Sequence, residues 1–291
     1  MKRVCFLLFF TLVVFSGCSS SINNEEYYFK QMDLEHLWEY SKGESQTIAF
    51  IDTGISNEAK EIYNDRIIDT YNSINNNDDV IDNHGHGTQM VSIVSGNGEK
   101  GVWGIAPKSK IMIIKAIGDE GSENPDSIIK AIDYAISKEV DIINMSFGSF
   151  VTNPDIQKKI EVAIKNNITV VASTGDYGNK DTLFPANMKG VVSVQAKNKR
   201  GTVWEHSNTS ENDIVAFPGV DISCLTLDNE KVKMNGTSQA TAIASGYIAL
   251  LRDYYKKNDI NFDNEKIIKD LKSLKSTQKQ NVNYLEIFGY D

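Results

Sequence analysis

The stretch Asn235-Gly236-Thr237-Ser238-Gln239-Ala240 places a serine between a glycine turn and a run of small, helix-compatible residues at 240–251. A hydroxyl in the first turn of a helix lies near free backbone N–H groups and the positive end of the helix dipole. A negative charge that develops there during a reaction is therefore stabilised. Because the same pattern is typical of an ordinary helix N-cap, the choice between nucleophile and cap depends on the residues upstream.

Two upstream segments supply the other groups that an activated serine needs. The apolar run at residues 47–51 is typical of a strand and ends in Asp52-Thr53-Gly54, which places a carboxylate at the strand end where active sites of open α/β sheets lie. Further on, Asp82-Asn83-His84-Gly85-His86-Gly87-Thr88 leads into a helical pattern. A serine hydroxyl needs an imidazole as base and a carboxylate that fixes the imidazole tautomer, and all three residue types are now present.

The order aspartate, histidine, serine resembles that of the subtilisin-type serine proteases, the subtilase family. The resemblance covers about residues 48–251. It implies that Asp52 orients the imidazole, that His86 is the general base and acid, and that Ser238 is the nucleophile. His86 is preferred to His84 because only His86 is followed by Gly-Thr, as in the family pattern; His84 is then a loop residue, with a metal role as the alternative.

Strand and helix patterns alternate along the chain. Apolar runs at residues 111–114, 142–145 and 168–172 are typical of strands, and isoleucines at helical spacing lie between them. This alternation predicts an α/β fold in three layers, with a mainly parallel, doubly wound sheet and helices on both faces. We expect one subtilisin-like peptidase domain at residues 47–291, with a surface helix at 264–274.

The resemblance also suggests where a substrate binds. Its main chain would pair with the segment Ser146-Phe147-Gly148. The pocket for the residue before the cut would be lined by Ser173, Thr174, Gly175, Tyr177 and Leu183.

One departure from the family pattern bears on the mechanism. Asp176 stands where subtilases usually have an asparagine whose side chain donates to the oxyanion. An ionised carboxylate cannot donate and would repel that oxyanion, although the backbone N–H of Ser238 remains as a donor. Three interpretations stay open: a slow or specialised protease, a protease in which a protonated Asp176 donates, and an inactive relative that binds peptides.

The amino end predicts export. Met1-Lys2-Arg3 precedes an apolar run at residues 4–15 that is shorter than the ~20 residues needed to cross a bilayer. Residues 1–17 therefore resemble a signal peptide, and Phe15-Ser16-Gly17-Cys18 resembles a bacterial lipobox, in which Cys18 is lipidated. Ordinary signal cleavage is the alternative. We expect a lipoprotein on the outer face of the bacterial cell membrane, with residues 18–46 as a polar tether and N-terminal segment.

Composition limits the partners. A formal net charge of −9 and a pI near 5.1 disfavour nucleic acid as a partner. The family resemblance implies a peptide or protein substrate, and we expect a monomer. After removal of Cys5 and lipidation of Cys18, Cys224 stands alone and no internal disulfide is expected. The triad chemistry requires no cofactor. Structural calcium stays open, and its candidate ligands are Glu61, Asn97 and Glu99.

These features lead to a predicted function. Residues 19–46 leave no room for the long prosegment that secreted subtilases usually carry. Subtilases that are small, anchored to the cell and poor in prosegment resemble the leader peptidases that mature lantibiotic-type peptides. We therefore predict a serine endopeptidase that processes secreted peptides at the cell surface. The alternatives are a general extracellular protease and, because of Asp176, a catalytically weak lipoprotein that binds peptides.

Overall fold

The computed structural model describes residues 26–210, 214–274 and 283–289. The predicted signal peptide, Cys18 and the first residues of the tether lie outside the described ranges. Within these ranges, no helix is both long and apolar enough to span a membrane.

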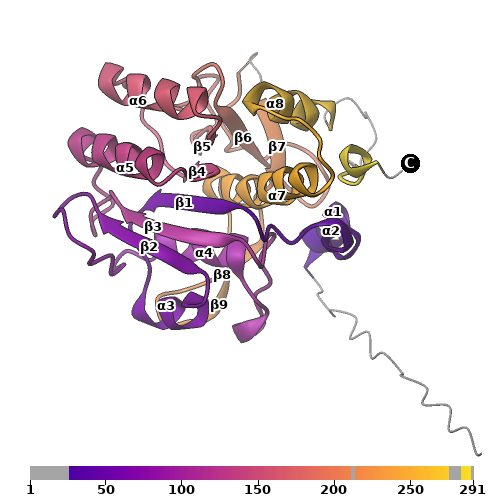
Figure 1. Ribbon diagram of the computed structural model, residues 1–291, viewed down its shortest axis with the longest axis horizontal. Coiled ribbons are helices and arrows are strands. Elements are labelled where there is room, and N and C mark those ends of the chain that lie inside the picture. The colour runs from indigo at the N-terminus through magenta and orange to yellow at the C-terminus, as the bar shows by residue number, and fades with distance from the viewer. Residues whose placement is uncertain (1–25, 211–213, 275–282, 290–291) are drawn as a thin grey trace, which may run out of the picture.

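Seven parallel strands form the central sheet, in the order β2-β3-β1-β4-β5-β6-β7 (Figure 1). Most of their residues are buried, as expected of a parallel sheet covered on both faces. The strands are β1 (Thr47–Asp52), β2 (Ile67–Asn72), β3 (Lys110–Lys115), β4 (Ile142–Met145), β5 (Thr169–Ser173), β6 (Val192–Lys197) and β7 (Ile214–Pro218).

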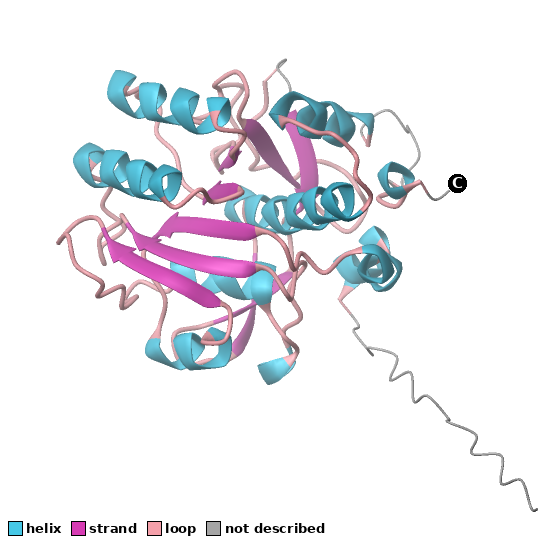
Figure 2. Ribbon diagram, viewed as in Figure 1, coloured by secondary structure: helices cyan, strands magenta, loops and turns pink. Residues whose placement is uncertain are grey.

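Helices cover both faces of the sheet, as Figure 2 shows. One face packs against α5 (Pro125–Ser137) and α6 (Pro154–Lys165), and the other against α4 (His86–Ser95) and the long α7 (Thr237–Lys257). Alternate residues of β1 point to the two cores, because successive strand side chains face opposite sides: Ile48 and Phe50 join the α4–α7 core, and Ala49 and Ile51 join the other. The predicted three-layer α/β fold is confirmed.

Smaller elements complete the α4–α7 face. The chain begins with α1 (Tyr27–Met32) and α2 (Leu34–Tyr40), and α2 is tied to the fold by Trp38, whose indole N–H donates to the Ile105 carbonyl at 2.8 Å. The remaining elements are α3 (Asn57–Tyr63), the antiparallel pair β8 (Ile222–Leu225) and β9 (Lys231–Met234), α8 (Asn264–Ser273), and the 3-10 turns η1 (Glu99–Gly101) and η2 (Glu286–Phe288). The helix α8 is the one expected at residues 264–274.

Candidate active site

Asp52 and His86 meet at the carboxyl edge of the sheet. Asp52 is the last residue of β1 and His86 the first of α4, and Asp52 Oδ1 lies 2.7 Å from His86 Nδ1. The Asp52 carboxylate is buried and also accepts the Thr53 N–H at 2.8 Å. Because Nδ1 is engaged, the Nε2 nitrogen of the imidazole is the one left for proton transfer.

A second buried carboxylate fixes the start of α4. Asp82 Oδ1 accepts the backbone N–H groups of His84 and Gly85, and Oδ2 accepts both the N–H and the hydroxyl of Thr88. These bonds satisfy donors at the helix N-terminus that have no intrahelical partner. The sequence places Asp82 four residues before His86, but its role as a helix cap was not predicted.

Close packing explains the glycine that follows His86. A Cβ at Gly87 would collide with the backbone oxygen of Gly54, so only glycine lets α4 approach the end of β1. The Gly87 N–H then donates to the Thr53 hydroxyl at 2.9 Å. The His-Gly-Thr pattern is thus required by the contact that brings the imidazole to Asp52.

The surroundings raise the pKa of His86 above its usual value. Burial acts to lower this pKa, but the charge of Asp52 and its hydrogen bond outweigh the effect of burial. The carboxylates of Asp82 and Asp176 add to the increase. Since a general base must be neutral, activity that depends on His86 should rise with pH through a value above the usual one for histidine.

Ser238 is the second residue of α7. Its hydroxyl donates to the backbone carbonyl of Ser146 at 2.7 Å, while the Ser146 hydroxyl donates to the Ser238 carbonyl at 3.2 Å. Within the described residues, no hydrogen bond joins Ser238 to His86. Proton transfer to the imidazole therefore requires the Ser238 side chain to rotate away from Ser146.

Asp176 lies against the beginning of the same helix. Its Oδ1 accepts the Thr237 N–H at 2.8 Å and the Thr237 hydroxyl at 2.7 Å. A Cβ at Gly236 would lie 2.9 Å from Oδ2, so the second carboxylate oxygen is next to the turn that carries Ser238. Asp176 thus lies beside the turn that carries Ser238, and its charge also acts on His86.

The segment Ser146-Phe147-Gly148, which is predicted to pair with substrate, has backbone groups that are available for hydrogen bonding. In the described structure, the backbone N–H and C=O groups of Phe147 and Gly148 have no hydrogen-bond partner, whereas the next residue, Ser149, pairs with Phe184. Such an open edge is suited to the addition of an extended peptide as a further strand.

The predicted pocket residues gather around Leu183. A Cβ at Gly148 would lie 3.0 Å from Leu183 Cβ, and one at Gly175, whose φ is 104°, would lie 2.7 Å from Leu183 Cδ1. Ser173 and Thr174 are buried beside them. Tyr177 is instead 65% exposed, and its ring lies 5.2 Å from that of Phe150, measured between centroids.

Two residues at this site were not foreseen. Phe150 forms the aromatic contact with Tyr177. Asn208 is buried and its Oδ1 accepts the N–H groups of Tyr177 and Asn179, which fixes the loop after Asp176. An isolated asparagine far along the chain carries no motif that would have revealed this role.

The calcium candidates do not form an acidic cluster. Among the described residues, no group of three or more His, Cys, Asp or Glu side chains could hold a metal ion. The Asn97 amide donates to Glu99 at 3.1 Å, and Glu61 lies exposed on α3. Calcium binding therefore stays open.

Cys224 lies in the core of the fold. It is buried, and burial raises the pKa of its thiol to about 12. A thiol held in its neutral form is a poor nucleophile, so Cys224 does not compete with Ser238 for that role.

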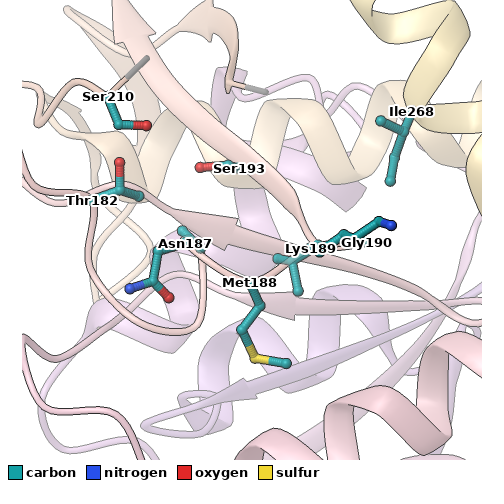
Figure 3. Close-up of a pocket in the computed structure, with 10 residues that line it drawn as sticks. Thr182, Asn187, Met188, Lys189, Gly190, Ser193, Ser210 and Ile268 are labelled. Atoms are coloured by element: carbon teal, nitrogen blue, oxygen red, sulfur yellow. The ribbon is translucent and has the colours of Figure 1, made fainter. Parts of the chain in front are cut away.

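A separate cavity of about 260 Å³ lies beside β6 and α8 (Figure 3). It is bounded by the segment after Leu183, by β6 and by Ile268 of α8, and the hydroxyls of Thr182, Ser193 and Ser210 are among its lining groups. None of the predicted site residues lines it.

The parallel sheet, with an aspartate, a histidine and a serine at its carboxyl edge, defines a protein of subtilisin-like architecture. The chain belongs to the subtilase family, whose model matches residues 43–290.

Relatives of the chain agree with this assignment. It is 31% identical to the minor extracellular protease Epr of Bacillus subtilis (strain 168) over 244 residues, which cover 82% of this chain and 37% of Epr. It is 33% identical to the major intracellular serine protease of the same organism over 229 residues, which cover 75% of this chain and 71% of the relative. The chain thus spans little more than a third of Epr's length.

Two solved structures are similar to this protein in fold. The prenylagaramide maturation protease PagA superposes with a TM-score of 0.75 at 26% identity, and the match covers 88% of this chain and 97% of PagA. A cold-adapted subtilisin-like serine proteinase gives a TM-score of 0.71 at 23% identity, over 80% of this chain and 83% of that protein; this second match supports the fold alone.

Proposed function

We propose that this protein is a subtilisin-type serine endopeptidase that uses Asp52, His86 and Ser238 as its catalytic triad. The observation that carries the proposal is the 2.7 Å contact between Asp52 Oδ1 and His86 Nδ1, at the sheet edge to which α7 brings Ser238. Membership of the subtilase family supports the same conclusion.

The reaction proceeds through an acyl-enzyme. Ser238 Oγ leaves the Ser146 carbonyl, gives its proton to His86 Nε2 and attacks the carbonyl carbon of the scissile bond. The C–N bond then breaks as the imidazolium returns the proton to the departing amine. Water, deprotonated in turn by His86, attacks the ester and releases the acid product with Ser238 restored.

Asp176 makes this reaction slow. The backbone N–H of Ser238 lies in the first turn of α7 and donates to the oxyanion, but an ionised Asp176 offers no second donor and adds repulsion. Loss of the corresponding side-chain donor in subtilisin costs about 10²–10³ in kcat, and we infer a reduction of that order here. The same residue favours the second candidate, a lipoprotein that binds peptides with little cleavage.

A precursor peptide is the substrate we propose. PagA is described as a maturation protease, and the structural match between the two proteins covers 97% of PagA. Other relatives are described as a minor extracellular and a cell wall-associated protease of Bacillus subtilis (strain 168), which supports export, whereas another is intracellular. General extracellular proteolysis is the alternative to precursor processing. Anchoring through Cys18 stays a prediction, with ordinary signal cleavage as its alternative.

A serine-directed phosphonate tests the proposal. Incubation of the purified protein followed by intact-mass analysis should show one adduct, located on Ser238 by peptide mapping and absent from Ser238→Ala. Cleavage of a precursor peptide at one bond, with casein left intact, would support maturation over general proteolysis. A protein with neither adduct nor cleavage, but with measurable peptide binding, would be the binding lipoprotein.

A further inference from the structure

A buried lysine ends beside the carboxyl edge of the sheet. Lys115 is the last residue of β3, and its Nζ donates to the carbonyl of Thr53 at 2.9 Å and to that of Ile81 at 2.7 Å. The same Nζ lies 2.5 Å from Asp119 Oδ1. Because an ammonium has three N–H donors, each donor has one acceptor. The charge is therefore fully used inside the fold, where three segments of the chain meet.

One of these carbonyls belongs to the segment that carries Asp52. Lys115 pairs with Asp52 in the register of the neighbouring strands β3 and β1, and the Asp52 carbonyl accepts the Ala116 N–H at 2.9 Å. Thr53 directly follows Asp52, and its hydroxyl accepts the Gly87 N–H at the start of α4. The bond from Lys115 to the Thr53 carbonyl therefore fixes the chain between the aspartate and the histidine helix.

The other carbonyl belongs to the segment that caps that helix. Ile81 directly precedes Asp82, whose carboxylate accepts N–H groups at the start of α4. Asp119 holds the same segment on the far side of the cap, because its Oδ2 accepts an N–H of the Asn83 amide at 2.9 Å. Lys115 and Asp119 together thus hold the chain immediately before and immediately after the capping aspartate.

No other group replaces the ammonium at these two carbonyls. In the part of the chain that the structure describes, the Thr53 and Ile81 carbonyls accept a hydrogen bond from Lys115 alone. A buried carbonyl without a donor is unfavourable. If Lys115 lost its ammonium, the two segments would have to move toward other donors, and they are the segments that bring Asp52 and His86 together.

We propose that Lys115 is a positioning residue for the triad, which sets the separation of Asp52 and His86 by holding the chain at Thr53 and at Ile81. It acts through the backbone and not by contact with the reacting atoms. The inference rests on the proposed endopeptidase activity, but it does not depend on the identity of the substrate.

Lys115→Met tests the inference, because it keeps an unbranched side chain and removes the ammonium. A misplacement of about 1 Å at a distance from the chemistry can lower the rate by about 10²-fold, so we expect kcat to fall on the order of 10–10²-fold. The predicted substrate segment at residues 146–148 makes no contact with Lys115, so KM should change little.

The pH profile separates positioning from a mere loss of stability. The carboxylates of Asp52, Asp82 and Asp176 raise the pKa of His86, and Asp52 does so through both its charge and its hydrogen bond. A longer Asp52–His86 contact weakens both effects, so the acid limb of kcat/KM should move to lower pH in Lys115→Met. Loss of the lysine charge alone would move it to higher pH. The NMR signal of the His86 Nδ1–H proton should also leave the low-field position that a short bond to a carboxylate gives it.

A second variant and a control complete the test. Asp119→Ala alters a half-exposed side chain and frees Asn83 while Lys115 keeps both carbonyls, so its kcat on the pH plateau should fall by a smaller factor. Lys138→Met is the matched control, because it removes an ion pair to Asp69 of 2.7 Å that joins β2 to the end of α5. It should keep the wild-type kcat, acid limb and NMR signal.

The remaining outcomes overturn the inference. A folded Lys115→Met with wild-type kcat refutes it, as does a lower kcat with an unchanged acid limb and an unchanged His86 signal, which would show a structural role alone. If Lys115→Met does not fold, wild-type kcat in Asp119→Ala refutes it. These results leave the endopeptidase intact. If the wild type neither cleaves peptides nor reacts with a phosphonate, the proposed activity fails and this inference fails with it.

Discussion

Replacing Asp176 with asparagine should accelerate the enzyme. Asp176 Oδ1 accepts two hydrogen bonds from Thr237, one from the N–H and one from the hydroxyl. In Asp176→Asn only the amide oxygen can accept the backbone N–H, so the amide orientation is determined and its NH₂ group takes the place of Oδ2. The variant thereby gains a donor beside the turn that carries Ser238.

The size of the gain follows from the missing donor. One such donor is worth about 10²–10³ in kcat, or about 3–4 kcal/mol of transition-state stabilisation, and this is the upper bound we expect for the increase. A second effect concerns His86, whose pKa the Asp176 charge helps to raise. Removal of that charge should move the acid limb of the kcat/KM profile to lower pH.

Steady-state kinetics across pH, with a peptide that both proteins cleave, provide the assay. Asp181→Asn is the matched control, because it removes the charge of an exposed aspartate in the same loop, and it should leave kcat close to the wild-type value. A variant that is no faster than wild type at any pH would refute the reasoning, since Asp176 would then not face the oxyanion.

Three other predictions concern separate parts of the chain. Ser238→Ala and His86→Ala should each abolish cleavage while the circular dichroism spectrum stays native; wild-type turnover in Ser238→Ala would mean a different nucleophile. The mature protein should begin at lipid-modified Cys18 and sediment with membranes, and an unmodified terminus beyond Cys18 in the culture medium would refute tethering. Lys197 is buried, and burial lowers its pKa to about 8, about 2.5 below its ordinary value of 10.5. The folded state therefore loses the proton before the unfolded chain does, so wild-type stability contains a penalty below pH 8 that fades as pH rises toward 10.5. Lys197→Met should be about 3 kcal/mol more stable than wild type in urea unfolding at pH 7, and a stability difference that does not shrink at higher pH would contradict this assignment.

The contact between Asp52 and His86 could be predicted because its constraints are local. The Gly after His86 is required by the contact with Gly54, and Asp52 follows the last apolar residue of a strand. Each requirement leaves a short pattern in the sequence. The alternation of strands and helices likewise follows from hydrophobic periodicity, which is why the fold was predictable.

Other parts of the site depend on contacts between distant segments and leave no such pattern. Asn208 supports the loop that begins some thirty residues earlier, with Tyr177 among its partners. The rotamer of Ser238, bonded to Ser146, depends on packing between β4 and α7.

The charge of Asp176 acts in opposite directions on the two ions that form during acylation. When Ser238 attacks, His86 becomes a cation and the substrate oxygen an anion. Asp176 favours the protonated imidazole, as the raised pKa of His86 indicates, but it disfavours the oxyanion. Because the interaction between two charges falls with their separation, the nearer ion decides the net effect. Oδ2 lies at the turn that carries Ser238, where the oxyanion forms, so the repulsion should exceed the help given to His86.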